Sequence, residues 1–471
     1  MFKPSYPPYD PIDKSGFSYE TVVKRWPVIL TGIVDRLHRL NHDLIVELNS
    51  NAIPISDDGS SSARADKLEE GKELIAKISA LKYQMGSNKD LAPIADDGEA
   101  DAYIYNIELL ALAKEGKNKW FTAPWLYAEC YLYRLLRSYL AQTTHWKSYD
   151  PFFTQKQETL QGSSVAIYKI ATTIHELEDQ KSALLGDVDT LQILFKEMIQ
   201  MCLWGNATDL SLLTHLTPED IAHLQTVGKD AQEARKEFIL LDDQKAVWAH
   251  LQSLKGQRVD FVLDNCKPGF ELFTDLVFAD FLVTYTSYVS KVVFHPKLFP
   301  WFVSDVTPPD FVDLFKCLLS PTFFPSAGSE DEQQNLHRMV TRWKGYLSSG
   351  VFELSVPEGT PLGAKNPVAD FWTEPWPYWN MKERARPLFE TLSESGLVVF
   401  KVEFFSLRGA FFHRETLSPL AGSFPLLSLR TNKADVAVGI NQDVADKLDE
   451  RGEKWRVSGK YALISWAPRV E

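Results

Sequence analysis

The feature that most constrains the fold of this chain is a change in its apolar pattern near Val247. Before that point, apolar residues recur at the spacing of amphipathic helices. After it, short runs rich in valine, phenylalanine and leucine alternate with longer helical stretches, a pattern that predicts a sheet with helices on both faces. We therefore predict an α/β fold. A helical N-terminal region, residues 1–246, packs on a C-terminal domain, residues 247–471, with a mixed, mostly parallel sheet flanked by helices.

The predicted elements follow from this spacing. The stretch 125–143 is too apolar for an exposed helix and predicts a central one. The stretch 51–65 is rich in Ser, Asp and Gly and predicts a loop. Other helices are expected at 20–48, 67–85, 106–114, 155–216, 218–240, 272–285 and 381–395. Strands are expected at 259–263, 291–295, 301–304, 397–401, 426–430, 434–440 and 461–466.

Composition narrows the classes of function. The net charge of −13 disfavours a broad nucleic-acid-binding surface, because phosphate backbones require clustered Lys and Arg. The four cysteines form no CxxC pair, which excludes the usual zinc-finger and thioredoxin patterns. No apolar segment of secretory or membrane-spanning length is visible. We expect a cytoplasmic protein with no nucleic-acid or membrane partner; access to the nucleus and the oligomeric state stay open.

Two acidic positions follow apolar runs and could bind a cation. The run 258–263 ends on Asp264 and Asn265, and the run 299–304 ends on Asp305. In open α/β sheets ligands collect beyond the carboxyl ends of strands, and carboxylate and carboxamide oxygens are hard ligands for a divalent cation. Taken singly, the first pair is explained more simply by an Asx turn and Asp305 by a loop or helix cap. Together, the three side chains predict a metal site with open positions for water and substrate.

A third polar segment joins two strand-like runs and contains Arg430 and Lys433. A planar guanidinium beside an ammonium suits a phosphate, although a polar hairpin would explain the segment as well. Glu271, at the start of the helix after the first strand, either favours the helix dipole or faces the metal site. No P-loop, GxGxxG fingerprint or GxSxG elbow is present, so nucleotide-binding and serine-hydrolase functions lack support.

These segments resemble the damage-control phosphatase family, in its sugar-phosphate subfamily with the RTxK motif, which includes acidic-residue methyltransferase-type proteins and fungal relatives. The family pattern Asp-Asn-x-Gly-Phe-Glu-Leu is similar to Asp264-Asn265 followed by Gly269-Phe270-Glu271-Leu272. The segment Pro300–Asp305 matches the next block, and Arg430–Lys433 matches RTxK. The blocks at 125–134 and 204–211 extend the resemblance over nearly the whole chain.

The resemblance implies metal-dependent hydrolysis of phosphorylated sugars such as fructose 1-phosphate, in metabolite damage control. It implies that Asp264, Asn265 and Asp305 bind Mn²⁺, Ni²⁺, Co²⁺ or Mg²⁺, with Asp264 and Asp305 catalytic. It further implies that Lys433 and Arg430 hold the substrate phosphate, and that Glu271 lines the same pocket beside Asp264 and Asn265. Whether Asp264 or a water molecule attacks the phosphorus stays open.

The chain departs from the family pattern in two places. Cys266-Lys267-Pro268 stands where the family has a single residue. Residues 402–414 replace the family segment Gly-Asp-Leu-Asn-Tyr-Arg-Lys, which contacts substrate, and either a gene-model difference or genuine divergence explains this. Two other functions are therefore kept as alternatives. One is S-adenosylmethionine-dependent methylation of protein glutamates, which lacks a glycine-rich fingerprint here, and the other is a non-catalytic family member.

Overall fold

The computed structural model describes residues 8–49, 60–179, 181–184, 187–205, 236–263, 269–324, 328–401, 420–433, 437 and 439–470. The N-terminal helices, with one π-helical turn η1, are α1 (Phe17–Glu20), η1 (Thr21–Arg25), α2 (Trp26–Asn49), α3 (Ser60–Gly86), α4 (Ala102–Lys114), α5 (Trp125–Ala141), α6 (Phe153–Gly162), α7 (Ser164–Asp179), α8 (Lys181–Leu184) and α9 (Val188–Gly205). The later helices are η3 (Lys236–Phe238), α12 (Gln244–Ser253), α13 (Phe270–Tyr285), α14 (Pro308–Leu319), α15 (Glu330–Ser349), η4 (Asp370–Thr373), η5 (Tyr378–Asn380), α16 (Met381–Arg384), α17 (Arg386–Ser393) and α18 (Gln442–Glu450). The strands are β1 (Ile239–Asp242), β2 (Gln257–Val262), β3 (Val289–His295), β4 (Phe352–Leu354), β5 (Leu397–Lys401), β6 (Leu426–Thr431) and β7 (Ala462–Ala467).

The strands form one seven-stranded sheet in the order β1-β7-β6-β5-β2-β3-β4. Strands β4, β3, β2, β5 and β6 are parallel to one another, while β7 is antiparallel to β6 and β1 is parallel to β7. The chain leaves β2 through α13 for β3 on one side, and β5 pairs with β2 on the other. The sheet therefore has a topological switch point between β2 and β5, the place where doubly wound sheets bind ligands.

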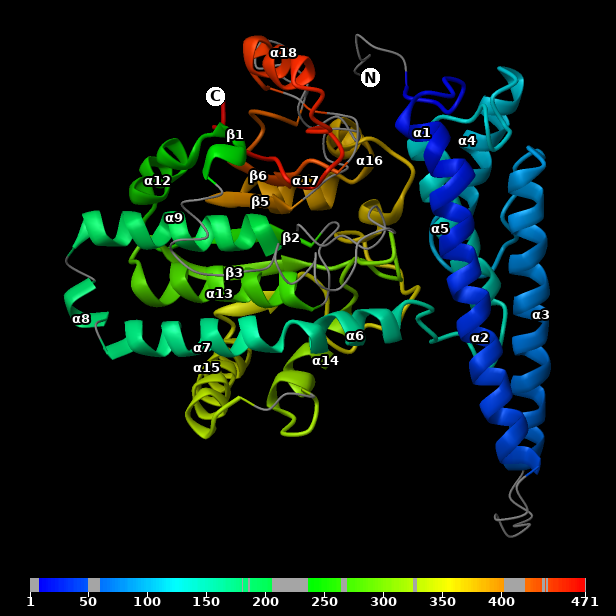
Figure 1. Ribbon diagram of the computed structural model, residues 1–471, viewed down its shortest axis with the longest axis horizontal. Helices are drawn as coiled ribbons and strands as arrows, with labels where there is room; N and C mark the ends of the chain where they lie inside the picture. Colours follow the sequence, from blue (N-terminus) through cyan, green and yellow to red (C-terminus); the bar gives the residue numbers. More distant parts are fainter. Residues whose placement is uncertain are drawn as a thin grey trace.

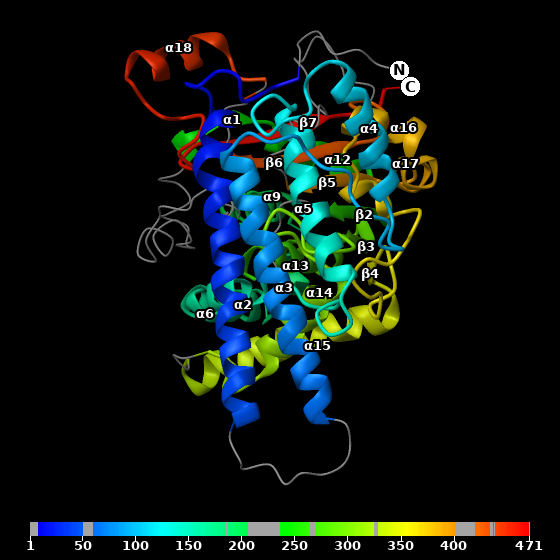
Figure 2. The ribbon, with the colours of Figure 1, turned by 90° about the vertical axis from the view of Figure 1, so that its right-hand side faces the viewer.

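Apolar side chains alternate along the strands and build a core on each face of the sheet. Val259 and Phe261 of β2 belong to one core, with helices α7, α9, α12, α13, α14 and α15. Val262 of β2 and Phe400 of β5 belong to the other, with α16, α17 and the N-terminal helices α2 to α5. Helices α2, α3 and α5 stand together at one side of the molecule in Figure 1, and Figure 2 views them from that side. The helical region thus extends one core of the sheet.

Most of the predicted elements are confirmed. The strand predicted at 397–401 is β5 without change, and the central helix predicted at 125–143 is α5, of which all but two residues are buried. Because α3 begins at Ser60, the predicted loop at 51–65 was too long. Residues 239 and 240, the end of the helix predicted at 218–240, belong to strand β1, and β6 pairs with β7 instead of forming the hairpin considered for the segment around Arg430. Of the strand predicted at 434–440, the described residues 437, 439 and 440 lie outside any strand.

The division at residues 246 and 247 stays a prediction. Strand β1 precedes that boundary and still belongs to the sheet, and both apolar cores combine helices from the two sides of it. Among the described helices, none is long and apolar enough to cross a membrane.

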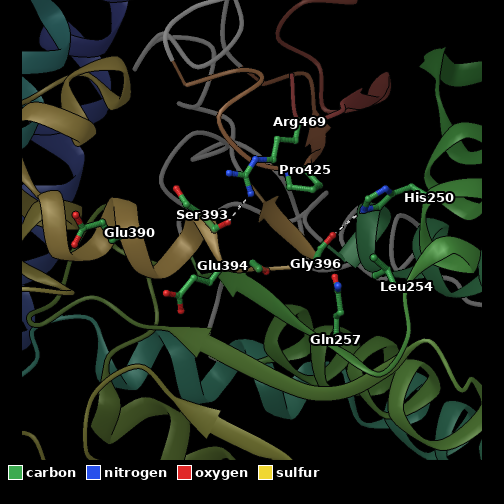
Figure 3. Close-up of a pocket in the computed structure, with 10 residues that line it drawn as sticks. His250, Leu254, Gln257, Glu390, Ser393, Glu394, Gly396, Pro425 and Arg469 are labelled. Atoms are coloured by element: carbon green, nitrogen blue, oxygen red, sulfur yellow. Dashed lines mark hydrogen bonds between the residues drawn. The ribbon is translucent and has the colours of Figure 1, made fainter. Parts of the chain in front are cut away.

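A cavity of about 640 Å³ opens at the amino-terminal ends of β2, β5 and β6. Figure 3 shows its lining, where His250 Nε2 lies 2.7 Å from the carbonyl oxygen of Gly396 and Arg469 donates to the carbonyl of Ser393. This is the edge of the sheet opposite to the one at which the predicted site residues lie. The cavity is therefore separate from the predicted site.

Candidate active site

Four buried cationic side chains lie where the parallel strands end. Lys297 follows β3, Lys401 is the last residue of β5, Arg430 lies near the end of β6 and Lys433 directly beyond it. Each is at most 2% exposed. We call this edge, formed by the ends of β2, β3, β5 and β6, the carboxyl edge. Buried charges are costly unless opposite charges face them, so this edge must hold anions.

One of these anions is Asp305, which is fully buried in the loop between β3 and α14. Its Oδ2 lies 3.8 Å from Lys297 Nζ. The same ammonium donates to the carbonyl of Trp372 at 3.3 Å and lies 5.5 Å from the centre of the Trp372 ring. Lys297 is thus a fixed positive charge beside a predicted metal ligand.

The turn before Asp305 has an unusual backbone. Phe302 and Val303 have φ angles of +47° and +68°, in the left-handed region that branched side chains avoid. The amide of Asp305 closes the turn by donating to the carbonyl of Trp301 at 3.0 Å. The strand predicted at 301–304 is therefore wrong, because these apolar residues form a buried turn that delivers Asp305 to the carboxyl edge.

A second charged group joins α9, α13 and β5. Lys401 Nζ donates to Asp275 Oδ1 at 2.7 Å, and Cys202 Sγ donates to the same oxygen at 2.8 Å. Burial raises the pKa of the Cys202 thiol well above its ordinary value, and the carboxylates of Asp275 and Glu271 raise it further. Cys202 is consequently a neutral hydrogen-bond donor, and the predicted residue Glu271 lies close to this group.

Helix α9 approaches α13 closely at Gly205. A Cβ atom added there would lie 2.7 Å from Thr274 Oγ1 and 3.7 Å from the Cα atom of Glu271. The Thr274 hydroxyl in turn donates to the Glu271 carbonyl at 2.8 Å. Glycine at this position therefore lets the end of α9 pack against the first turn of α13, which carries Glu271.

Beneath the carboxyl edge, Asp260 of β2 and His295 of β3 form a buried pair of side chains. His295 Nε2 donates to Asp260 Oδ1 at 2.8 Å, and Arg258 Nε donates to the other oxygen at 2.7 Å. Burial alone would raise the pKa of Asp260, but the hydrogen bond from His295 and the electrostatic interactions with His295 and Arg258 outweigh it and hold the pKa low. The carbonyl of His295 accepts from the amide of Leu263, the residue just before Asp264. This pair fixes the two strands from which the predicted metal ligands follow.

Asn432 is a feature of the carboxyl edge that the sequence did not indicate. Its backbone is held by two 2.7 Å hydrogen bonds, from its amide to the Tyr461 carbonyl and from the Gly459 amide to its own carbonyl. Its side chain is fully buried, and in the described part of the chain neither Oδ1 nor Nδ2 has a hydrogen-bond partner. A buried side-chain amide without hydrogen-bond partners is destabilising. At an edge of the sheet where ligands bind, such an amide indicates that a bound ligand supplies the missing hydrogen bonds.

The structure therefore brings together only part of the predicted site. Asp305, Glu271, Arg430 and Lys433 are all buried in segments that meet at the carboxyl edge. Asp264 and Asn265 lie outside the described residues, as do both segments that depart from the family pattern. Lys297, Lys401 and Asn432 were missed, since a lone lysine or asparagine near a strand end carries no spacing signal.

The predicted metal ligands fit a divalent cation in their chemistry, because two carboxylates and a carboxamide are hard oxygen donors. Within the residues that the structure describes, no three His, Cys, Asp or Glu side chains lie close enough together to hold a metal ion. To bind a metal ion, Asp305 would thus need Asp264 and Asn265 as further ligands. Asp264 and Asn265 follow β2 in sequence, and Asp305 follows β3, the strand that pairs with β2.

Comparison with known proteins identifies the family. The family described as "Damage-control phosphatase ARMT1-like domain" matches residues 21–448. This chain belongs to that family of damage-control phosphatases. The protein named "Damage-control phosphatase ARMT1" from Xenopus tropicalis is 31% identical over 482 residues, covering 97% of this chain and 98% of the relative. Proteins of the same name from Danio rerio (31% over 475 residues, 96% and 95% covered) and Homo sapiens (28% over 480 residues, 96% and 97% covered) are similarly related.

Proposed function

We propose that this chain is a divalent-metal-dependent phosphatase that hydrolyses phosphorylated sugars, with fructose 1-phosphate as the model substrate. The observation that carries this proposal is the group of four buried cations at the carboxyl edge: Lys297, Lys401, Arg430 and Lys433. Asp305 lies beside Lys297, and Asp275 accepts a hydrogen bond from Lys401, so in this proposal Arg430 and Lys433 are the cations that bind an anionic ligand. A phosphate monoester matches both the charge and the family.

In this proposal the site residues have separate roles in binding and in catalysis. Arg430 and Lys433 hold the phosphate, the guanidinium through paired hydrogen bonds and the ammonium as a point charge. Lys297, beside Asp305, offsets charge that develops on the phosphoryl oxygens during transfer. Asp264, Asn265 and Asp305 would hold the divalent cation, which when bound supplies polarisation of the phosphoryl group. Either Asp264 or a water molecule attacks, and Glu271 lines the pocket.

The methyltransferase alternative receives no support from the site. A dinucleotide or S-adenosylmethionine pocket in a doubly wound sheet normally uses a glycine-rich loop after the first strand of the βαβ unit. Here that strand is β2, and the residues that follow it read Asp264-Asn265-Cys266-Lys267-Pro268. Fold alone does not separate the two activities, but this loop favours cation and phosphate chemistry.

The direct test is phosphate release by the purified chain from fructose 1-phosphate and other sugar phosphates. We expect release with added Mn²⁺, Co²⁺, Ni²⁺ or Mg²⁺ and loss of release with a chelator. Asp264→Ala should abolish the activity and the metal stimulation together. Full activity in chelator, or no release from any sugar phosphate while methyl transfer to glutamate occurs, would contradict the proposal.

A second prediction concerns the sugar. We propose that the Asn432 amide hydrogen-bonds substrate hydroxyls, because its buried donor and acceptor otherwise stay unsatisfied among the described residues. Asn432→Leu should lower kcat/KM for sugar phosphates by about tenfold, since one such interaction contributes ~1–3 kcal/mol. An aryl phosphate without hydroxyls is the matched control and should be hydrolysed at nearly the same rate by both proteins. Equal losses on the two substrates would remove Asn432 from sugar recognition.

A further inference from the structure

The turn that carries Asp305 cannot be stable by its own backbone preference. Phe302 and Val303 both have left-handed backbones, at φ +47° and +68°, and valine is especially disfavoured there. Such a conformation persists only where its surroundings determine it, and the turn from Trp301 to Asp305 is buried throughout. The position of the Asp305 carboxylate therefore depends on the side chains that pack around this turn.

Tyr133, in the middle of α5, packs on the turn from the helical region. Its ring centre lies 5.0 Å from that of Phe302 and 5.9 Å from that of Trp301. The Phe302 and Trp301 rings also meet edge to face at 5.5 Å. Relaxing either left-handed residue would move these rings, so the aromatic contacts of Tyr133 oppose relaxation of the turn.

Lys156 of α6 fixes the chain on the other side of Asp305. Its ammonium donates to the Asp305 carbonyl at 3.3 Å, to Asp310 at 2.8 Å and to Asp150 at 2.7 Å. Asp310 is also the capping-box residue of α14, accepting from the amide and hydroxyl of Thr307. One buried ammonium therefore ties the Asp305 backbone to the first turn of α14.

We propose that Tyr133 and Lys156 are positioning residues: through them the helical N-terminal region holds Asp305 in the geometry that catalysis requires. The proposal rests on the proposed function only in taking Asp305 as a functional ligand. Neither residue lies on the sheet, and neither belongs to the predicted metal or phosphate ligands. A displacement of about 1 Å at a reacting centre can reduce a rate by about a hundredfold, so loosening this turn has a large kinetic effect.

The test compares two tyrosines of α5. Tyr133→Leu removes the ring that packs on the turn, whereas Tyr131→Leu removes an equally buried ring, which stacks on Tyr127 and meets Trp120 edge to face instead. The two variants should lose similar thermal stability. Tyr133→Leu should lower kcat at saturating metal by about tenfold or more with KM within about threefold, and Tyr131→Leu should leave kcat within about twofold. Tyr133→Phe, which keeps the ring, should restore kcat.

A second readout does not depend on activity. Amide hydrogen exchange across residues 297–306 of the metal-free protein should be faster in Tyr133→Leu and unchanged in Tyr131→Leu, because the bonds from Asp305 to Trp301 and from Lys297 to Val306 lie in this segment. Equal exchange in the two leucine variants would overturn the inference, as would equal losses in kcat. Absence of metal-dependent phosphate release in the unmodified protein would instead contradict the proposed function, and the exchange comparison would still decide whether Tyr133 holds the turn.

Discussion

Replacing Asp305 with asparagine is expected to lower kcat/KM for sugar-phosphate hydrolysis by about a hundredfold or more. The substitution keeps the shape of the side chain and removes the charge that lies 3.8 Å from Lys297 Nζ. A lost metal ligand removes several kcal/mol of transition-state stabilisation, and each ~1.4 kcal/mol corresponds to a factor of ten. The measurement is steady-state phosphate release over a range of metal concentrations, with metal binding followed separately by calorimetry.

Asp313→Asn is the matched control for this experiment. Asp313 lies on α14, eight positions after Asp305, and forms a surface ion pair with Lys316 at 2.7 Å. Its loss should leave both metal binding and turnover nearly unchanged, because surface ion pairs contribute little. Asp305→Asn activity within threefold of the unmodified protein would show that Asp305 is not a functional ligand.

Replacing Arg134 with methionine is expected to have the largest effect on stability. Its guanidinium forms a bidentate pair with Asp97, at 2.7 and 2.9 Å, and two further bonds to the carbonyl of Ala100, with both charged side chains fully buried. Removing one partner leaves a buried charge uncompensated, at a cost of ~3–5 kcal/mol. Denaturant or thermal unfolding measures the loss. Arg386→Met, which breaks the exposed pair Arg386–Glu390, should change stability little.

The effect of Arg134→Met should depend on pH in a defined direction. Burial alone would raise the pKa of Asp97, but the hydrogen bonds and charge of Arg134 outweigh it and hold the pKa below its ordinary value. A lowered folded-state pKa contributes stability in full above the unfolded value, about pH 4, and the contribution is lost as pH falls through the folded value. The stability difference between the two proteins should therefore shrink below about pH 4. A difference that grows on acidification would contradict this assignment.

Much of the fold could be predicted because its elements are strongly periodic. Strand β5 was predicted at its observed bounds, since an unbroken apolar run such as Leu397–Lys401 suits a strand buried on both faces. The parallel sheet followed from the alternation of such runs with helices. The predicted meeting of Asp264 and Asp305 at one edge rested on a strand at 301–304 that does not form, and Asp305 reaches the carboxyl edge through the loop between β3 and α14 instead.

The predictions that were wrong or missing concern features that depend on tertiary packing. Nothing in the run Trp301–Ser304 signals a left-handed turn, because phenylalanine and valine disfavour that backbone and the surrounding side chains impose it. Lys297 was missed because its burial is a property of the folded chain. Asn432 was missed for the same reason, since only the folded chain shows that its side chain has no hydrogen-bond partner among the described residues. The contact between Tyr133 of helix α5 and Phe302 of the Asp305 turn joins residues about 170 positions apart in sequence. No local sequence pattern predicts such a contact.

The two departures from the family pattern named above lie on either side of the switch point between β2 and β5. One departure begins at Cys266, shortly after β2 ends at Val262, and the other begins at residue 402, where β5 has just ended. Val262 and Phe400 are partners in the ladder between these two strands, so both variable segments leave the sheet from adjacent positions. Both departures from the family pattern therefore begin next to the carboxyl ends of two paired strands, at the edge of the sheet that carries Arg430 and Lys433.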